Sequence, residues 1–317
     1  MPEDILINIT PQETRVALVD AGVVQELHVE REAGRGLVGN ICIGRVARVL
    51  PGMQSAFVDI GLERAAFLHI ADIFEHRGNG DAGKPITRPP IERVLAEGQP
   101  LMVQVVKDPI GTKGARLSTQ ISLAGRLLAY LPQDPHIGIS QRIEREEERK
   151  VLRERMQTVV PAEEKGGFIV RTMAESASQD ELKADVDYLR RLWQDIRTRA
   201  AGAVAPSMLY QDLSLAQRVL RDLAHSDTGR VVVDSRENFV KLQAFAQDYT
   251  QSVHDKIEHY VGERPLFELY NIDEEIERAL SRRVDLKSGG YLIIDQTEAM
   301  TTIDVNTGSY LGTRNLE

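Results

Sequence analysis

The chain is poor in cysteine and aromatic residues, and it has no long apolar run. Its one cysteine, Cys42, excludes an internal disulfide and a zinc site made of several cysteines, so Zn²⁺ is not expected in this chain. No apolar stretch approaches the roughly 20 residues that cross a bilayer, so no membrane association is expected. The N-terminus carries acids and no basic segment, unlike a secretory signal. These absences together favour a reducing cytoplasm.

Basic residues are also in deficit, with 39 Lys and Arg against 48 Asp and Glu and a net charge of −9. This balance argues against a protein that binds bulk nucleic acid through its overall charge. It does not exclude a nuclease, which needs only local basic and aromatic patches for the strand and local carboxylates for a metal. The length of 317 residues and the 42% hydrophobic content predict a folded protein with two or more cores.

Two strand patterns fill the first 120 residues. Strands are expected at residues 5–9, 14–20 and 23–30, and Asp20-Ala21-Gly22 has the chemistry of a short hairpin turn. From residue 39, about five short strands with glycine corners predict a small barrel of the oligonucleotide-binding kind. The Gly/Pro-rich stretch 76–90 between them is expected to be an exposed loop.

The pattern becomes mixed after residue 131. A charged helix is expected at 141–160, and the capping box of Ser178 and Glu181 opens a second helix with an apolar stripe. An α/β unit and a final helix at 276–283 follow, and then two strands. His254 and His259 are expected on one helix, where a spacing of five residues puts them on different sides and excludes a metal pair.

Two phenylalanines stand out in the expected barrel. Strand alternation in SAFVDIG and AAFLHI places Phe57 and Phe67 on the polar side of their strands. Exposed rings on a barrel stack unpaired bases, although both rings packing under the glycine-rich loop is an alternative. Lys113, in the turn that follows the next strand, is a candidate phosphate contact or simply a solvated lysine.

Two further pairs have functional chemistry. Arg171 offers a planar fork to phosphate oxygens and Thr172 a neighbouring hydroxyl, although a solvated arginine at a strand end is commoner. Asp304 and Asn306 share one strand face and are hard ligands suited to Mg²⁺, although the same pattern suits a turn. Asp295, on the adjacent expected strand, is a supporting group or a structural aspartate.

The candidate residues lie in five longer sequence segments, in this order: RVLPGMQSAFVDIG, AAFLHIADI, MVQVVKDPIGTKGARLST, GGFIVRT and SGGYLIIDQTEAMTTIDVNTG. Over essentially the whole chain these segments resemble the ribonuclease E/G family, and their sequences are closer to its G branch. The resemblance implies an α+β multi-subdomain fold, in which an RNase H-like subdomain is split around an S1-type OB barrel and a 5′-sensor region. An incomplete DNase I-like subdomain follows. The implied segments are RNase H-like 1–38, barrel 39–120, sensor region 121–215, RNase H-like 216–280 and DNase I-like 281–317.

The resemblance also assigns residue roles. It implies RNA contacts at Phe57, Phe67 and Lys113, a 5′-monophosphate pocket of Gly125, Arg171 and Thr172, and a catalytic pair of Asp304, as Mg²⁺ ligand, with Asn306. The implied activity is Mg²⁺-dependent endonucleolytic cleavage of single-stranded RNA, stimulated by a 5′-monophosphate, in rRNA maturation and mRNA decay. The full-length protein is expected to be a homo-oligomer.

Two family features fall after Glu317, namely the second metal-binding aspartate and the cysteines that link subunits through zinc. We therefore expect this piece to bind RNA with little or no cleavage. The alternatives are a non-catalytic RNA-binding module and a scaffold protein whose phenylalanines are buried or contact a protein partner. Substitution of Asp304 and of the two phenylalanines separates these possibilities.

Overall fold

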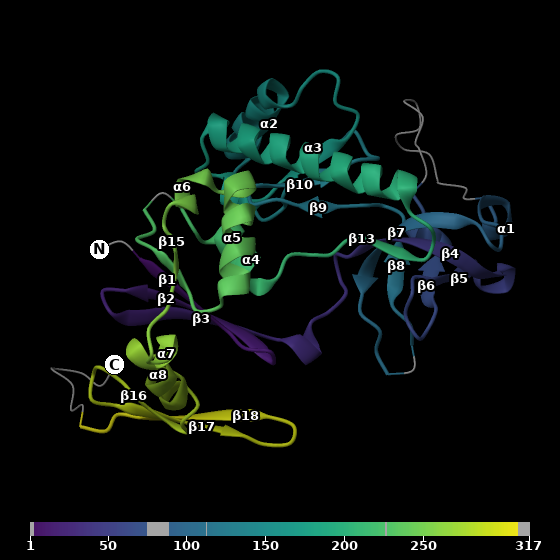
Figure 1. Cartoon of the computed structure of the whole chain (residues 1–317). Helices are drawn as coiled ribbons and strands as arrows, with labels where there is room; N and C mark the ends of the chain where they lie inside the picture. The colour runs from purple at the N-terminus through teal and green to yellow at the C-terminus, as the bar shows by residue number, and fades with distance from the viewer. Residues whose placement is uncertain (1–2, 75–88, 112, 226, 310–317) are drawn as a thin grey trace. The chain divides into compact units, whose positions relative to one another are not determined.

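The computed structural model describes residues 3–74, 89–111, 113–225 and 227–309 (Figure 1). The expected loop at 76–90 lies almost wholly outside the described residues. The chain divides into two compact units, one of residues 1–32 and 224–317 and the other of residues 33–223. Within the described residues, no helix is long and apolar enough to cross a membrane.

A five-stranded mixed sheet with the order β15-β14-β1-β2-β3 organises the first unit. Its strands are β1 (Asp4–Ile9), β2 (Glu13–Asp20), β3 (Val23–Arg31), β14 (Val231–Val233) and β15 (Ile257–His259). Strands β1 to β3 form the predicted antiparallel meander, and β14 and β15 run parallel to β1. Ala21 and Gly22 have φ of 48° and 80°, as a two-residue hairpin turn requires. The predicted hairpin is therefore confirmed.

Four helices lie in the described part of this unit, namely α5 (Arg236–Tyr249), α6 (Gln251–His254), α7 (Leu266–Leu269) and α8 (Ile272–Ala279). Of these, α5 and α7 contact the sheet. Leu6 of the central strand lies in one apolar cluster with Leu266 and Phe267 of α7. The expected helix through His254 and His259 was wrong, because α6 ends at His254 and the chain then extends the sheet as β15. The final helix also begins and ends about four residues earlier than expected.

The second unit contains a closed five-stranded barrel of the OB type. Its strands are β4 (Ile41–Leu50), β5 (Ser55–Asp59), β6 (Ala66–His69), β7 (Pro100–Lys107) and β8 (Arg116–Ser118). They pair in the order β4-β5-β6-β8-β7 and close through β4 and β7, which confirms the predicted barrel. A short helix, α1 (Ile91–Val94), packs into its core, and β13 (Ser207–Tyr210) pairs with β4 outside the ring.

A four-stranded sheet with the order β11-β12-β10-β9 forms the rest of the second unit. Its strands are β9 (Leu123–Ala124), β10 (Leu128–Leu131), β11 (Ile137–Ile139) and β12 (Gly167–Val170). The helices are α2 (Glu146–Val159), α3 (Gln179–Gly202) and α4 (Leu215–Asp222), of which α3 contacts β9 and β10. The predicted capping box opens α3, with both reciprocal bonds between Ser178 and Glu181 present. Its predicted stripe is buried at Leu182, Val186, Leu189 and Ile196.

The first unit ends in a small antiparallel sheet of three strands, β16 (Arg283–Asp285), β17 (Tyr291–Gln296) and β18 (Thr301–Asn306). Two strands were expected here, and β16 is an addition to them. Side chains of β18 are exposed from Thr301 to Val305. This sheet therefore carries the predicted metal ligands on an open surface.

Candidate nucleic-acid interface and metal ligands

The barrel brings the two predicted phenylalanines together. Phe57 of β5 and Phe67 of β6 are cross-strand partners, with ring centroids 6.3 Å apart in an edge-to-face arrangement. Phe57 is 38% exposed and Phe67 is half-buried, whereas Ala56, Val58 and Leu68 lie in the barrel core. The predicted division of faces is therefore confirmed, and the two rings form one small aromatic surface on the outside of the barrel.

Sequence reasoning missed the cations beside this aromatic pair. Phe57 pairs with Arg48 of β4, and Phe67 pairs with Arg116 of β8, so one row of side chains crosses four strands. Asp72 accepts two bonds from the Arg116 guanidinium, at 2.9 and 3.2 Å, which raises the pKa of Arg116 and fixes its position. The row could not be read from the sequence because a bulge between Val46 and Arg48 sets the register.

Lys113 lies in a tight turn shortly before β8. Its backbone pairs with that of Ile110, and its side chain is exposed. The neighbouring Gly114 packs so closely that a Cβ there would lie 2.2 Å from the Ala65 carbonyl oxygen. The Phe67 N–H then bonds to the carbonyl of Ala115 at 2.7 Å. The turn is thus anchored along the strand that carries Phe67.

The predicted phosphate residues also meet. Arg171 follows β12 and precedes a single 3-10 turn, η4 (Thr172–Ala174). Its Nη1 donates to the Gly125 carbonyl at 2.6 Å and approaches the Arg126 carbonyl at 3.4 Å. Within the described residues, Nε and Nη2 make no hydrogen bond, and neither does the Thr172 hydroxyl. The guanidinium is therefore oriented by two carbonyls and keeps unused donors.

Asp185 of α3 is a further polar residue at this place, and the sequence reasoning did not identify it. Its carboxylate accepts the backbone N–H groups of residues 126–128 at 2.8 to 3.2 Å. Burial raises the pKa of Asp185 above its ordinary value, although these bonds and the charge of Arg221 act in the opposite direction. The only signal in the sequence is an acid at the border of the apolar stripe of α3, which is weak.

Asp304 and Asn306 lie side by side on β18, as strand alternation predicted. The Asn306 Nδ2 donates to Asp304 Oδ2 at 3.0 Å. Asp295 of β17 is engaged by Arg282 in an exposed bidentate ion pair, which holds the pKa of Asp295 below its ordinary value. In the described part of the chain, no three His, Cys, Asp or Glu side chains gather in a metal site. A carboxylate and an amide are hard donors, and they fit Mg²⁺ as a partial ligand set because this ion retains several waters.

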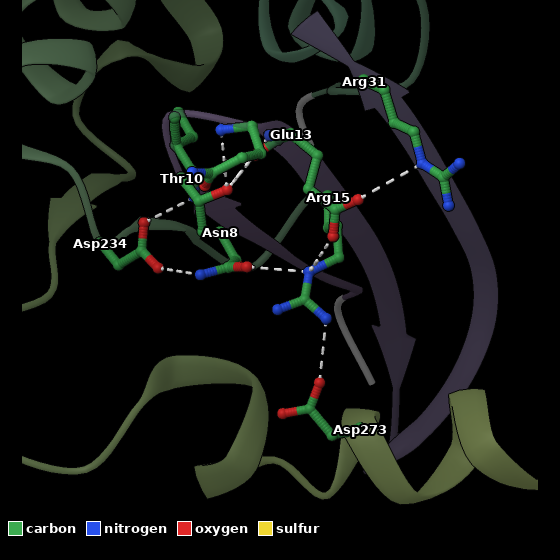
Figure 2. A network of polar contacts seen from close by, with 9 residues as sticks. Asn8, Thr10, Glu13, Arg15, Arg31, Asp234 and Asp273 are labelled. Atoms are coloured by element: carbon green, nitrogen blue, oxygen red, sulfur yellow. Dashed lines mark hydrogen bonds and ion pairs between the residues drawn. The ribbon is translucent and has the colours of Figure 1, made fainter. Parts of the chain in front are cut away.

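Another acidic group lies at the ends of β1 and β14 (Figure 2). Asn8 bridges Asp234 and Arg15, and Arg15 reaches Asp273 of α8 at 3.0 Å. Glu13 also lies 3.6 Å from the Arg15 guanidinium. Figure 2 shows this guanidinium between the acidic side chains. One guanidinium thus offsets part of the charge of three carboxylates, and its bond to Asp273 joins α8 to the sheet.

Comparison with known proteins adds a direct result. Residues 122–317 match the model of the Ribonuclease E/G family. The chain is 53% identical to Ribonuclease G of Salmonella typhimurium (strain SL1344) over its whole length, and it spans 65% of that protein. It is 49% identical to Ribonuclease G of Haemophilus influenzae, with 99% of the chain aligned to 64% of the relative. Ribonuclease E of a Nostoc species is 37% identical over 98% of the chain, which corresponds to 44% of that protein.

Proposed function

This chain belongs to the ribonuclease E/G family, and on that premise we propose that the protein is an endoribonuclease acting on single-stranded RNA. The observation that carries the proposal is the 53% identity to Ribonuclease G, over a matched region that spans the whole chain. In the proposal, cleavage is Mg²⁺-dependent, leaves 5′-phosphate and 3′-hydroxyl ends, and is stimulated by a 5′-monophosphate on the substrate. It serves rRNA maturation and mRNA decay in the cytoplasm, in a protein that is a homo-oligomer.

The proposed architecture assigns a role to each part. The sheet order β15-β14-β1-β2-β3, with three antiparallel and two parallel strands, supports an RNase H-like subdomain of residues 1–38 and 216–280. The barrel would be the S1-type subdomain of residues 39–120, and residues 121–215 the 5′ sensor. Residues 281–317 would begin a DNase I-like catalytic subdomain, which the three-stranded sheet supports.

The barrel would hold the RNA strand. Phe57 and Phe67 present an edge-to-face pair at the surface, and base stacking on such a ring contributes roughly 1–3 kcal/mol per base. Arg48 is exposed beside Phe57, and Lys113 is exposed shortly before β8. Both would contact phosphates, and each cation would also add salt-dependent affinity. Because these contacts read no base edge, we expect little sequence preference from the barrel.

The four-stranded sheet would read the 5′ end. The Gly125 carbonyl holds Nη1 of Arg171, which leaves Nε and Nη2 for the oxygens of a terminal phosphate. The Thr172 hydroxyl would add a neighbouring donor. A 5′-hydroxyl offers neither the charge nor the acceptors, so this pocket favours a phosphorylated end.

Chemistry is proposed at Asp304. Its carboxylate and the amide oxygen of Asn306 would hold Mg²⁺, and the Asn306 Nδ2 orients the carboxylate at 3.0 Å. When bound, the ion supplies positive charge that stabilises the charge developing at the phosphodiester.

The direct test compares binding of a short single-stranded RNA that carries a 5′-monophosphate with the same RNA that carries a 5′-hydroxyl. We expect the phosphorylated RNA to bind about tenfold tighter or more, because charge-assisted bonds to phosphate are worth roughly 1.5–3 kcal/mol. Arg171→Ala should abolish the difference, whereas Arg153→Ala, on an exposed position of α2, should not. Equal binding of both RNAs by the unmodified protein would refute the sensor.

A second measurement tests the barrel. Phe57→Ala and Phe67→Ala should each weaken binding of either RNA by roughly 1–3 kcal/mol per lost stack and leave the 5′ preference unchanged. RNA affinity that survives the double substitution would indicate that the rings serve another purpose, such as contact with a protein partner.

A further inference from the structure

Three consecutive peptide groups lie between Asp185 on α3 and Arg171 at the end of β12. A trans peptide is planar, so its N–H and its C=O point in opposite directions. The N–H groups of residues 126–128 donate to the Asp185 carboxylate at 3.2, 2.9 and 2.8 Å. The carbonyls that belong to these same peptides are those of residues 125–127. With their N–H groups on the carboxylate, these carbonyls must face away from α3.

All three carbonyls face Arg171. The oxygens of Gly125 and Arg126 lie 2.6 and 3.4 Å from its Nη1, and the oxygen of Leu127 accepts its backbone N–H at 2.8 Å. Each peptide dipole is thus aligned between a carboxylate at its N–H end and Arg171 at its C=O end. In a half-buried site such aligned bonds polarise and strengthen one another. The orientation of the guanidinium therefore depends on groups that Asp185 holds.

The fit between the segment and Asp185 leaves no spare room. A Cβ at Gly125 would lie 2.5 to 2.8 Å from the Asp185 carboxylate, which is too close for any side chain. On the preceding residue, the buried Arg221 of α4 donates to the Ala124 carbonyl at 2.9 Å while it pairs with Asp222. The segment is consequently held from two helices before any ligand arrives.

We propose that Asp185 is the positioning residue of the 5′-phosphate pocket, acting on Arg171 through the three peptides between them. This inference rests on the function proposed above. Asp185 contacts no RNA in this arrangement. It fixes the carbonyls that occupy one nitrogen of Arg171, so that the remaining donors are presented in one orientation. The glycine at position 125 is required for the same reason, since the carboxylate occupies the space of its missing Cβ.

The test uses the full chain and the RNA pair with 5′-monophosphate and 5′-hydroxyl ends. Asp185→Asn keeps the shape but places an amide donor against backbone donors, and Gly125→Ala displaces the carboxylate by a steric route. Each should reduce the preference for the phosphorylated end about tenfold and leave affinity for 5′-hydroxyl RNA unchanged. Asp187→Asn, exposed on the same helix, is the matched control and should keep the full preference.

Hydrogen exchange on the unmodified protein provides a reading that does not depend on whether the variants fold. The amides of residues 126–128 should be protected before RNA is added, and exchange at the rate of an open loop would overturn the inference. A preference retained in both variants would overturn it while leaving the sensor in place. An equal loss of affinity for both RNAs would also overturn the inference, because it indicates a general structural role for Asp185. No preference in the unmodified protein would instead refute the sensor itself.

Discussion

The sheet around Arg171 and the sheet that carries Asp304 each present a charged group to a phosphate in the proposed function, but they hold it differently. Arg171 is bonded to the carbonyls of peptides whose N–H groups donate to Asp185 of α3. Asp304 lies on an exposed strand and is contacted by the amide of Asn306. A substitution near Arg171 therefore acts through a chain of neighbouring contacts, whereas a substitution at Asp304 should affect the chemistry alone.

The largest effect is expected at Asp304. Asp304→Asn removes the proposed ionised ligand, and cleavage should fall by about 100-fold or more, since metal stabilisation of charge is worth several kcal/mol. RNA affinity and thermal stability should not change, because the side chain is exposed. Asp285→Asn, on an exposed position of the same sheet, is the control and should cleave normally. Undiminished cleavage by Asp304→Asn would exclude this residue as a metal ligand and favour a binding module.

The same comparison indicates which features were predictable. The placement of Phe57 and Phe67 on the outer face followed from strand alternation, and that of Asp304 beside Asn306 followed from the same rule. Both depend only on neighbours within two residues or on one hairpin. Local periodicity is therefore sufficient to place a side chain on one face of its strand, whereas its partner on the next strand, such as Arg48 beside Phe57, depends on the register.

Contacts between segments that are distant in the sequence were harder to predict. The approach of Arg171 to Gly125 spans 46 residues and was expected only from family resemblance. Asp185 was missed because its role depends on the rotation of α3 over the sheet, which periodicity does not specify to one residue. The segment from His254 to His259 was wrongly predicted as one helix because pairing of β15 with β14 outweighs local propensity.

An intermediate effect is expected at Glu164, which supports the four-stranded sheet near Arg171. Its carboxylate accepts the Tyr130 hydroxyl at 2.8 Å and the Gly166 N–H at 2.9 Å, and it pairs with Arg190 of α3. Glu164→Gln should lower the free energy of unfolding by about 1–3 kcal/mol at pH 7, because it weakens bonds to partly buried donors. Urea denaturation measures this loss. Glu163→Gln, at the exposed neighbour, is the control and should change stability little.

The effect at Glu164 should also depend on pH. Burial alone raises the pKa of Glu164, but the bonds from Gly166, Tyr130 and Arg190 outweigh it and hold the pKa below its ordinary value. A depressed carboxyl pKa contributes stability that is present above the unfolded-state pKa of about 4.3 and is lost as the pH falls through the folded-state pKa. The stability difference between Glu164→Gln and the unmodified protein should therefore shrink below about pH 4. A difference that is equal at pH 7 and pH 3 would contradict this assignment.

The smallest effect is expected at Asp295, on the strand next to Asp304. Arg282 holds this carboxylate through two bonds, but both side chains are exposed, and solvent screens such a pair. Asp295→Asn should leave the thermal midpoint and the cleavage rate unchanged. Because Ile293, two residues before Asp295, is the cross-strand partner of Asp304, the two carboxylates lie on one face of the sheet. A large loss of cleavage with an unchanged midpoint would thus place Asp295 in the catalytic site, and the open sheet would then hold two acidic ligands rather than one.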